Sequence, residues 1–166
     1  HPAAIADIVE QLDPRQRTQV IEALDVETAA DTIEEMEDEE AAAVMETLEE
    51  GRAADILEEM EPDAAADVLG DLPEERTEEL LYHMEPEEAA DLKELLAYHD
   101  ETAGGMMTTE FIAIPAKLTA EQTIGRLREL APRAEAVYYI YVVDDDGRLV
   151  GVLSLRDLIV AEPEAQ

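Results

Sequence analysis

Two aspartates, Asp63 and Asp67, have the spacing that places both carboxylates on one side of a helix. A hard cation such as Mg²⁺ is held in proteins by one or two carboxylates together with water molecules. This pair is therefore a candidate cation site. Two structural roles compete with that interpretation. Asp63 can be an acidic residue of a first helical turn, where the helix dipole favours it. Asp67 occupies a position at which aspartate recurs along the chain.

Residues for catalysis form no recognisable motif in the sequence. The three histidines lie far apart, with no serine nucleophile near them, and Gly104-Gly105 lacks the lysine of a phosphate-binding loop. The chain has no cysteine, which excludes disulfides and zinc–thiolate sites. We therefore expect a protein without enzymatic activity.

The charge of the chain indicates what it can bind. With 44 acidic and 11 basic residues, the formal net charge is -33. Nucleic acids and anionic membranes bind through Lys and Arg, so neither is an expected partner. Divalent cations are the expected partners. The alternative is that the acidic residues only solvate the helix surfaces or adapt the protein to high salt.

The hydropathy of the sequence and its first residue indicate what the parent protein would contain beyond this chain. No apolar run approaches the ~18–20 residues that span a bilayer. The sequence begins with His1 rather than Met, so we expect it to be a piece of a longer chain. Any function that needs a membrane would then lie outside it.

The candidate aspartates belong to a repeat. From Ala3 to Tyr98, a twelve-residue unit occurs eight times, and its tenth position is always Leu or Met. Apolar residues at positions 3, 6, 7 and 10 have the spacing of one helical face. Helices this short are unstable alone in water, so they must pack on neighbouring units. We predict that residues 1–98 form an all-α superhelix of short helices.

A change of pattern follows at residues 99–105, which we interpret as a joint because Gly104-Gly105 frees the backbone. The remaining residues, 106–166, predict the order β-α-β-β-α, and the whole chain is therefore of the α+β class. The predicted elements are a strand at Phe111 to Ile114, a helix from the capping residue Thr119 to Leu130, a buried strand at Ala136 to Asp144, a strand at Leu149 to Leu153, and a helix starting at Ser154.

The second part resembles one CBS motif, the module named after cystathionine β-synthase. The resemblance is carried by MMTTEFIAI, by YYIYVVDDDGRLVG, and by GVLSLRDLI, in which Gly151, Ser154 and Asp157 match a Gly-x-hydrophobic-Ser/Thr-x-x-Asp pattern. An acidic helical repeat followed by ETAGGMMT and this motif resembles the cytosolic region of the MgtE magnesium transporters. Relative to that family, the sequence stops before a second CBS motif, a connecting helix and a membrane pore.

The resemblance implies a role for the aspartates. Through the match at EPDAAAD, it implies that Asp63 and Asp67 are Mg²⁺ ligands, with Asp100 and Glu101 as weaker candidates. It also implies a regulatory region at the cytoplasmic face of the cell membrane. Such a region would sense Mg²⁺ by closing when divalent cations bridge acidic faces of its two domains. Its partners would be the pore of the same parent protein and a second copy, paired through the CBS motifs.

CBS motifs commonly bind ATP or another adenine nucleotide, and the resemblance assigns five residues to this role. Asp157 would accept the ribose hydroxyls, Ser154 and Arg156 would face the phosphates, and Tyr139 would pack on the base beside Val137. The structural alternatives are that Asp157 supports the start of its helix and that Tyr139 belongs to the strand core. At the level of the whole chain, the alternative is a free-standing scaffold for protein–protein interaction or adenine-nucleotide sensing.

Overall fold

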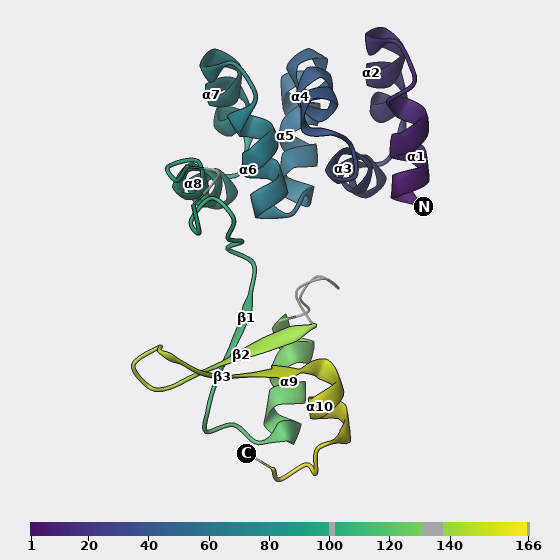
Figure 1. The fold of residues 1–166 in the computed structure, drawn as a ribbon. Helices are drawn as coiled ribbons and strands as arrows, with labels where there is room; N and C mark the ends of the chain where they lie inside the picture. The colour runs from purple at the N-terminus through teal and green to yellow at the C-terminus, as the bar shows by residue number, and fades with distance from the viewer. Residues whose placement is uncertain (100–101, 131–137, 166) are drawn as a thin grey trace. The chain divides into compact units, whose positions relative to one another are not determined.

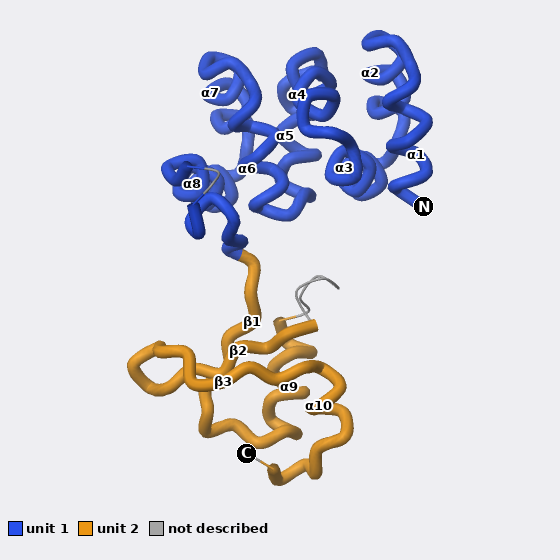
Figure 2. The backbone as a smooth tube through the Cα atoms, in the orientation of Figure 1, with its two compact units in different colours: residues 1–109 blue, residues 110–166 orange. Residues whose placement is uncertain are grey.

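The computed structural model of this chain describes residues 1–99, 102–130 and 138–165. These residues form two compact units, 1–109 and 110–166 (Figure 2). Each unit has its own hydrophobic core. Val137, Asp100 and Glu101, named above as candidate site residues, lie outside the described residues.

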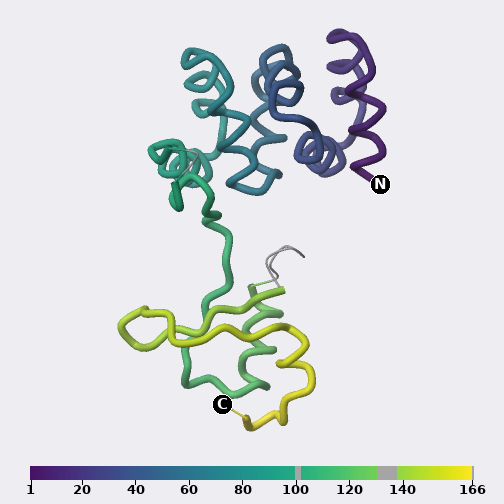
Figure 3. The backbone as a smooth tube through the Cα atoms, in the orientation of Figure 1, coloured from purple at the N-terminus to yellow at the C-terminus, as the bar shows by residue number. Residues whose placement is uncertain are grey.

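Within residues 1–99, each twelve-residue unit forms one helix, as predicted (Figures 1 and 3). The helices are α1 (Pro2–Val9), α2 (Pro14–Ala23), α3 (Val26–Glu34), α4 (Asp38–Thr47), α5 (Glu50–Glu59), α6 (Pro62–Gly70), α7 (Glu74–His83) and α8 (Pro86–Leu95). Proline stands at the first position of several of them, where its missing N–H costs nothing. The tenth position of the repeat is buried from Met36 to Met84 and only half-buried at Leu12, Leu24 and Leu96, near the two ends of the series.

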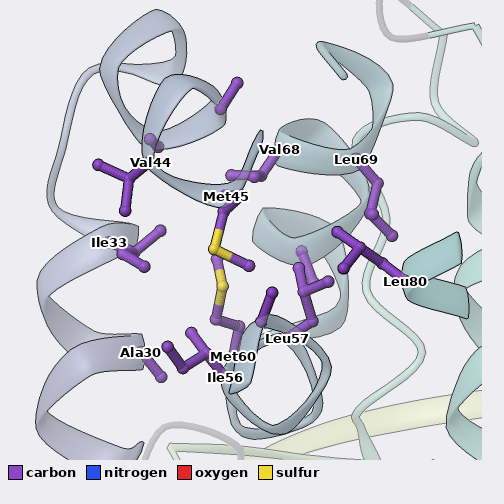
Figure 4. Close-up of a cluster of buried hydrophobic side chains, with 14 of the residues drawn as sticks. Ala30, Ile33, Val44, Met45, Ile56, Leu57, Met60, Val68, Leu69 and Leu80 are labelled. Atoms are coloured by element: carbon purple, nitrogen blue, oxygen red, sulfur yellow. The ribbon is translucent and has the colours of Figure 1, made fainter. Parts of the chain in front are cut away.

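The helices pack in two rows. In one row α1 packs on α3, α3 on α5 and α5 on α7, and in the other α2, α4, α6 and α8 follow one another. The structural repeat is therefore two helices, or 24 residues, twice the sequence repeat. Figure 4 shows part of the helical core, which includes Met45 of α4 and Met60, the residue that follows α5. Alanines at the third and fourth positions, such as Ala29 and Ala30, are buried in the same core.

A ladder of glutamates repeats with this 24-residue period. Glu10, Glu34 and Glu58 each accept a hydrogen bond from a backbone N–H 27 residues later, at Glu37, Glu61 and Glu85, with N–O distances of 2.8, 2.5 and 2.5 Å. The three donors are the residues that precede α4, α6 and α8. Each carboxylate thus satisfies an N–H at the start of one helix from the neighbouring row.

Two arginines 24 residues apart, Arg52 and Arg76, donate hydrogen bonds to carbonyls at the C-terminal ends of helices, and we call them the arginine ladder. The Arg52 Nη2 donates to the Leu24 carbonyl at the end of α2, at 2.6 Å. Arg76, 24 residues later, donates to the Met45 and Leu48 carbonyls at the end of α4, at 2.5–3.3 Å. These carbonyls have no partner inside their own helix, and the negative end of the helix dipole favours a cation there.

The second unit has the predicted β-α-β-β-α order. It comprises β1 (Ile112–Pro115), α9 (Ala120–Leu130), β2 (Tyr139–Val143), β3 (Leu149–Ser154) and α10 (Leu155–Val160). The sheet order is β1-β2-β3, with β1 parallel and β3 antiparallel to β2. The predicted cap of α9 is present, since Thr119 and Gln122 exchange side chain–backbone hydrogen bonds of 3.0 and 3.3 Å.

The prediction of a fully buried central strand was wrong for the described part of β2. Ile140 is buried and packs with residues of α9 and α10 on one face of the sheet. Tyr139, in contrast, is 63% exposed, and Tyr141 is 36% exposed. Among the described residues, helices cover one face of this sheet and leave the other open, so β2 alternates between buried and exposed residues. We call the opposite face, with Phe111, Tyr139, Tyr141 and Val152, the outer sheet face. On it Phe111 and Tyr141 meet edge to face with 6.0 Å between ring centroids.

The arginine ladder can be tested by replacing Arg76 with Met, which keeps an apolar stem and removes the guanidinium. The Arg76 side chain is only 12% exposed, so the substitution leaves two carbonyls without their donor. We expect the free energy of unfolding to fall by about 2 kcal/mol. Urea unfolding followed by circular dichroism at the helical band measures this change.

The matched control is Arg126→Met, because Arg126 is 54% exposed and its ion-pair partner among the described residues is the exposed Glu129. Its effect should stay below about 0.5 kcal/mol. Equal unfolding midpoints for the two variants would show that the guanidinium of Arg76 does not stabilise the end of α4.

Candidate functional site

A cavity lined by four aspartates lies in the first unit. Its volume is about 390 Å³. Its lining consists of Asp38, Asp63, Asp67, Gly70, Asp71, Gly105 and Met106. The structure thus brings the two predicted ligands together on one cavity, and it adds two aspartates that the sequence analysis did not single out.

The α6 helix places most of this lining. Asp63, Asp67 and Asp71 follow one another at intervals of four and therefore lie along one face of the helix. The opposite face carries Ala65, Ala66, Val68 and Leu69, which are buried in the helical core. Burial of this apolar face leaves the aspartate face pointing away from the core. Asp38 comes from the first turn of α4, which packs on α6 in the same row.

The cavity is strongly electronegative. Its lining includes four carboxylates and no basic residue among the described residues. The Oδ1 atom of Asp63 is buried without a hydrogen-bond partner. A carboxylate oxygen removed from water is costly unless a donor or a cation compensates it. The cavity is therefore suited to a positively charged ligand.

The arrangement also sets how an ion can be held. Within the described part of the chain, no group of three or more His, Asp or Glu side chains converges closely enough to enclose a metal ion. An ion in this cavity would contact one or two carboxylates and keep much of its water shell, as Mg²⁺ commonly does in proteins. The cavity has room for such water, since a molecule of liquid water takes about 30 Å³.

In the second unit, Asp157 forms a capping box with Ser154. The Ser154 hydroxyl donates to Asp157 Oδ2 at 2.6 Å, the Ser154 N–H donates to the same oxygen at 3.2 Å, and the Asp157 N–H donates to Ser154 Oγ at 3.2 Å. These hydrogen bonds, and to a lesser degree the charge of Arg156, lower the pKa of Asp157 below its ordinary value. Asp157 therefore supports the start of α10 and remains an exposed, ionised carboxylate.

A second, mostly apolar cavity of about 190 Å³ lies beside Asp157, which is its one ionisable residue among the described residues. Its apolar walls include Ile114, Val142 and Leu158. This volume is below the roughly 300 Å³ of small-molecule pockets, so the second unit alone can enclose only part of a nucleotide.

The predicted nucleotide residues lie around the end of β3. Tyr139 is the cross-strand partner of Ser154, which places the aromatic ring and the start of α10 at the same end of the sheet. Tyr139, Ser154 and Arg156 do not line the apolar cavity. Tyr139 lies on the outer sheet face, which excludes the alternative that it is core.

The signals for the missed residues were weak in the sequence. Asp71 extends the Asp63–Asp67 spacing by one further helical turn and could have been found from it. Asp38 reaches the cavity only because α4 and α6 stack, which follows from the 24-residue period and not from the twelve-residue one.

Comparison with known families matches both parts of the chain. Residues 1–101 match the MgtE intracellular N domain, and residues 103–164 match the CBS domain. None of the helices in the described residues combines the length and the apolar composition needed to cross a membrane.

Curated relatives share the sequence over less than half of this chain. The magnesium transporter MgtE of Thermus thermophilus is 52% identical over 75 residues, which cover 45% of this chain and 17% of the relative. The magnesium transporter MgtE of Enterococcus faecalis is 53% identical over 73 residues, covering 44% of this chain and 16% of the relative. The matched stretch is thus about a sixth of the length of these relatives.

Solved structures match nearly the whole chain. The cytosolic domain of the Mg²⁺ channel MgtE in complex with ATP has a TM-score of 0.90 and 39% identity, over 99% of this chain and 68% of that one. The soluble part of a magnesium transporter has a TM-score of 0.85 and 37% identity, over 99% of this chain and 65% of that one. The chain belongs to the MgtE family, with an MgtE intracellular N domain followed by a CBS domain.

Proposed function

We propose that this chain is the Mg²⁺-sensing regulatory region of an MgtE-like magnesium transporter. It would act at the cytoplasmic face of the cell membrane on the pore of its parent protein, without catalysing a reaction. Sensing would consist of closure when divalent cations bridge acidic faces of the two domains. Asp63 and Asp67 are the proposed ligands.

One observation carries this proposal: the four-aspartate cavity of the first unit, with the buried and unpartnered Oδ1 of Asp63. The distribution of charge supports it. Residues 1–109 hold 34 of the 44 acidic residues and only 5 of the 11 basic residues. Repulsion among these carboxylates is therefore concentrated in the first unit, where a bound divalent cation relieves it most.

The free energy available from binding is sufficient for a switch. A ligand that binds only one of two arrangements stabilises that arrangement by RT ln(1 + [L]/Kd), which is about 2.7 kcal/mol at a hundredfold excess over Kd. That amount changes the ratio of the two arrangements by roughly a hundredfold. At millimolar cation, a hundredfold excess corresponds to a Kd of about 10 μM.

The cation site is tested by the double substitution of Asp63 and Asp67 with Asn, which keeps the shape and removes two charges. We expect Mg²⁺ to raise the melting temperature of the unmodified chain by about 5 °C or more over K⁺ at the same ionic strength. The double variant should lose this difference. Thermal unfolding followed by circular dichroism, in EDTA, Mg²⁺ and K⁺, measures it.

Asp55→Asn is the matched control. Asp55 occupies the same position of the repeat as Asp67, is exposed and does not line the cavity, so its variant should keep the full Mg²⁺ response. If K⁺ stabilised the unmodified chain as well as Mg²⁺ does, simple screening would explain the charge, and the scaffold alternative would be favoured. Identical small-angle scattering in EDTA and in Mg²⁺ would contradict closure.

We propose as a second role that the second unit binds an adenine nucleotide at the end of β3. ATP is present in the complex of the related MgtE cytosolic domain. In this chain, Tyr139, Ser154, Arg156 and Asp157 lie near one another along the end of the β2–β3 pair and the first turn of α10. Val137, the fifth proposed contact, lies outside the described residues.

Asp157→Asn separates nucleotide binding from helix capping, because an amide oxygen can still accept the hydrogen bonds from Ser154. We expect the Kd for ATP to rise about tenfold or more, with only a small fall in the melting temperature from the loss of the charge. Titration calorimetry measures the affinity. Asp146→Asn, in the exposed turn between β2 and β3, is the control. Unchanged ATP affinity in Asp157→Asn would leave Asp157 with the capping role alone.

The outer sheet face supports the proposed pairing of two copies through their CBS units. It carries three exposed aromatic rings and a β-branched residue, which is more contiguous apolar surface than scattered exposed residues would give. Covering it with the same face of a second copy satisfies the symmetry of a twofold dimer.

Tyr141→Lys tests this pairing by placing a charge in the middle of the outer sheet face. We expect the unmodified chain to sediment as a dimer and the variant as a monomer in analytical ultracentrifugation, because an unpaired buried ammonium is costly. Tyr82→Lys is the control, since Tyr82 is 85% exposed but belongs to α7. A dimer that survives in Tyr141→Lys would contradict pairing through this face.

A further inference from the structure

Tyr98, which follows α8, lies in contact with Gly104. A Cβ atom at Gly104 would lie closer than 3.0 Å to three ring atoms of Tyr98, namely Cδ1, Cγ and Cε1. Real Cβ atoms essentially never come so close, so Gly104 is required for space. Its φ is outside the left-handed region, which means that backbone conformation is not the reason for glycine here.

Thr102 fixes the turn that brings Gly104 under the ring. Its hydroxyl donates to the His99 carbonyl at 2.7 Å and accepts from the Gly105 N–H at 3.2 Å. The Met106 N–H donates to the Thr102 carbonyl at 3.1 Å. Three hydrogen bonds around one residue therefore hold this segment in a single turn.

The same segment forms a wall of the four-aspartate cavity. Gly105 and Met106 line the cavity opposite residues of α6, and the next residue, Met107, packs against the helical core. The wall is thus anchored on both sides, by the Tyr98 ring over Gly104 before it and by Met107 after it. A displacement at Gly104 is transmitted directly to Gly105.

We propose that Tyr98 and Gly104 are positioning residues for the cation cavity, an inference that rests on the proposed Mg²⁺ site. They contact no ion themselves. Their packing holds the segment of Gly105 and Met106 in the wall of the four-aspartate cavity, which limits the space open to an ion and its water shell. Groups that orient the direct ligands of a metal typically change its affinity by one to two orders of magnitude when they are altered.

The test uses Gly104→Ala, Tyr98→Ala and the double variant of the full chain, titrated with MgCl₂ alone at constant ionic strength. Melting temperature against Mg²⁺ concentration gives the apparent Kd. We expect each single variant to raise the Kd about tenfold. Because both substitutions remove the same contact, the Kd of the double variant should be no higher than that of the more affected single variant. A merely structural role would lower the melting temperature in EDTA and leave the Kd unchanged.

Gly125→Ala in α9 is the control, because a Cβ there meets no atom within 4 Å and the residue lies in the other unit. If Gly104→Ala failed to fold, Tyr98→Ala alone would decide, since it removes the ring without creating a clash. A normal Mg²⁺ response in Tyr98→Ala and in Gly104→Ala, or additive losses in the double variant, would overturn the positioning role. Absence of any Mg²⁺ response in the unmodified chain would instead overturn the proposed cation site.

Discussion

The helical unit depends on the satisfaction of helix ends across a 24-residue repeat. Helices of eight to ten residues leave a large share of their backbone N–H and C=O groups without intrahelical partners. Apolar packing of the Leu/Met and Ala positions brings the helices together but cannot satisfy these groups. Glutamates supply acceptors to the starts of α4, α6 and α8, and arginines supply donors to the ends of α2 and α4. Both ladders have the two-helix period and run from one row to the other, so they hold the two rows in register.

This use of arginine has an electrostatic consequence. Arg17, Arg52 and Arg76, three of the five basic residues in the first unit, direct their guanidinium N–H groups at backbone carbonyls. Their charges are therefore held at helix ends and are not available to the aspartate face of α6. On that face, the Oδ1 atom of Asp63 is buried without a hydrogen-bond partner. The use of arginines to satisfy helix ends thus stabilises the stack and also leaves the cavity electronegative.

The sequence predicted the elements better than their pairing. The twelve-residue pattern identified one helix per unit because the Leu/Met position never varies, and the capping residues Thr119 and Ser154 marked the helix starts of the second unit. The ladder glutamates could not be recognised, since they stand among many exposed glutamates and differ only in the helix that they reach. Asp38 was missed for the same reason. The exposed face of β2 was missed because an apolar run does not reveal whether one or both faces of a strand are covered.

For the proposed cation site, hydration is the property that would distinguish Mg²⁺ from competing ions. Ca²⁺ binds best where six to eight protein and water oxygens surround it closely, and it loses its hydration readily. Mg²⁺ loses its water slowly and is commonly bound through one or two carboxylates, with water as its remaining ligands. The aspartates lie along α6 at four-residue intervals, and within the described residues no three acidic groups converge on one point. This arrangement offers the one or two carboxylates that Mg²⁺ requires and few of the close oxygens that Ca²⁺ requires. Monovalent ions at the same positions have half the charge, and their attraction to the carboxylates falls accordingly. A site of this kind binds weakly and reversibly, which suits a sensor whose occupancy must follow the concentration of the ion.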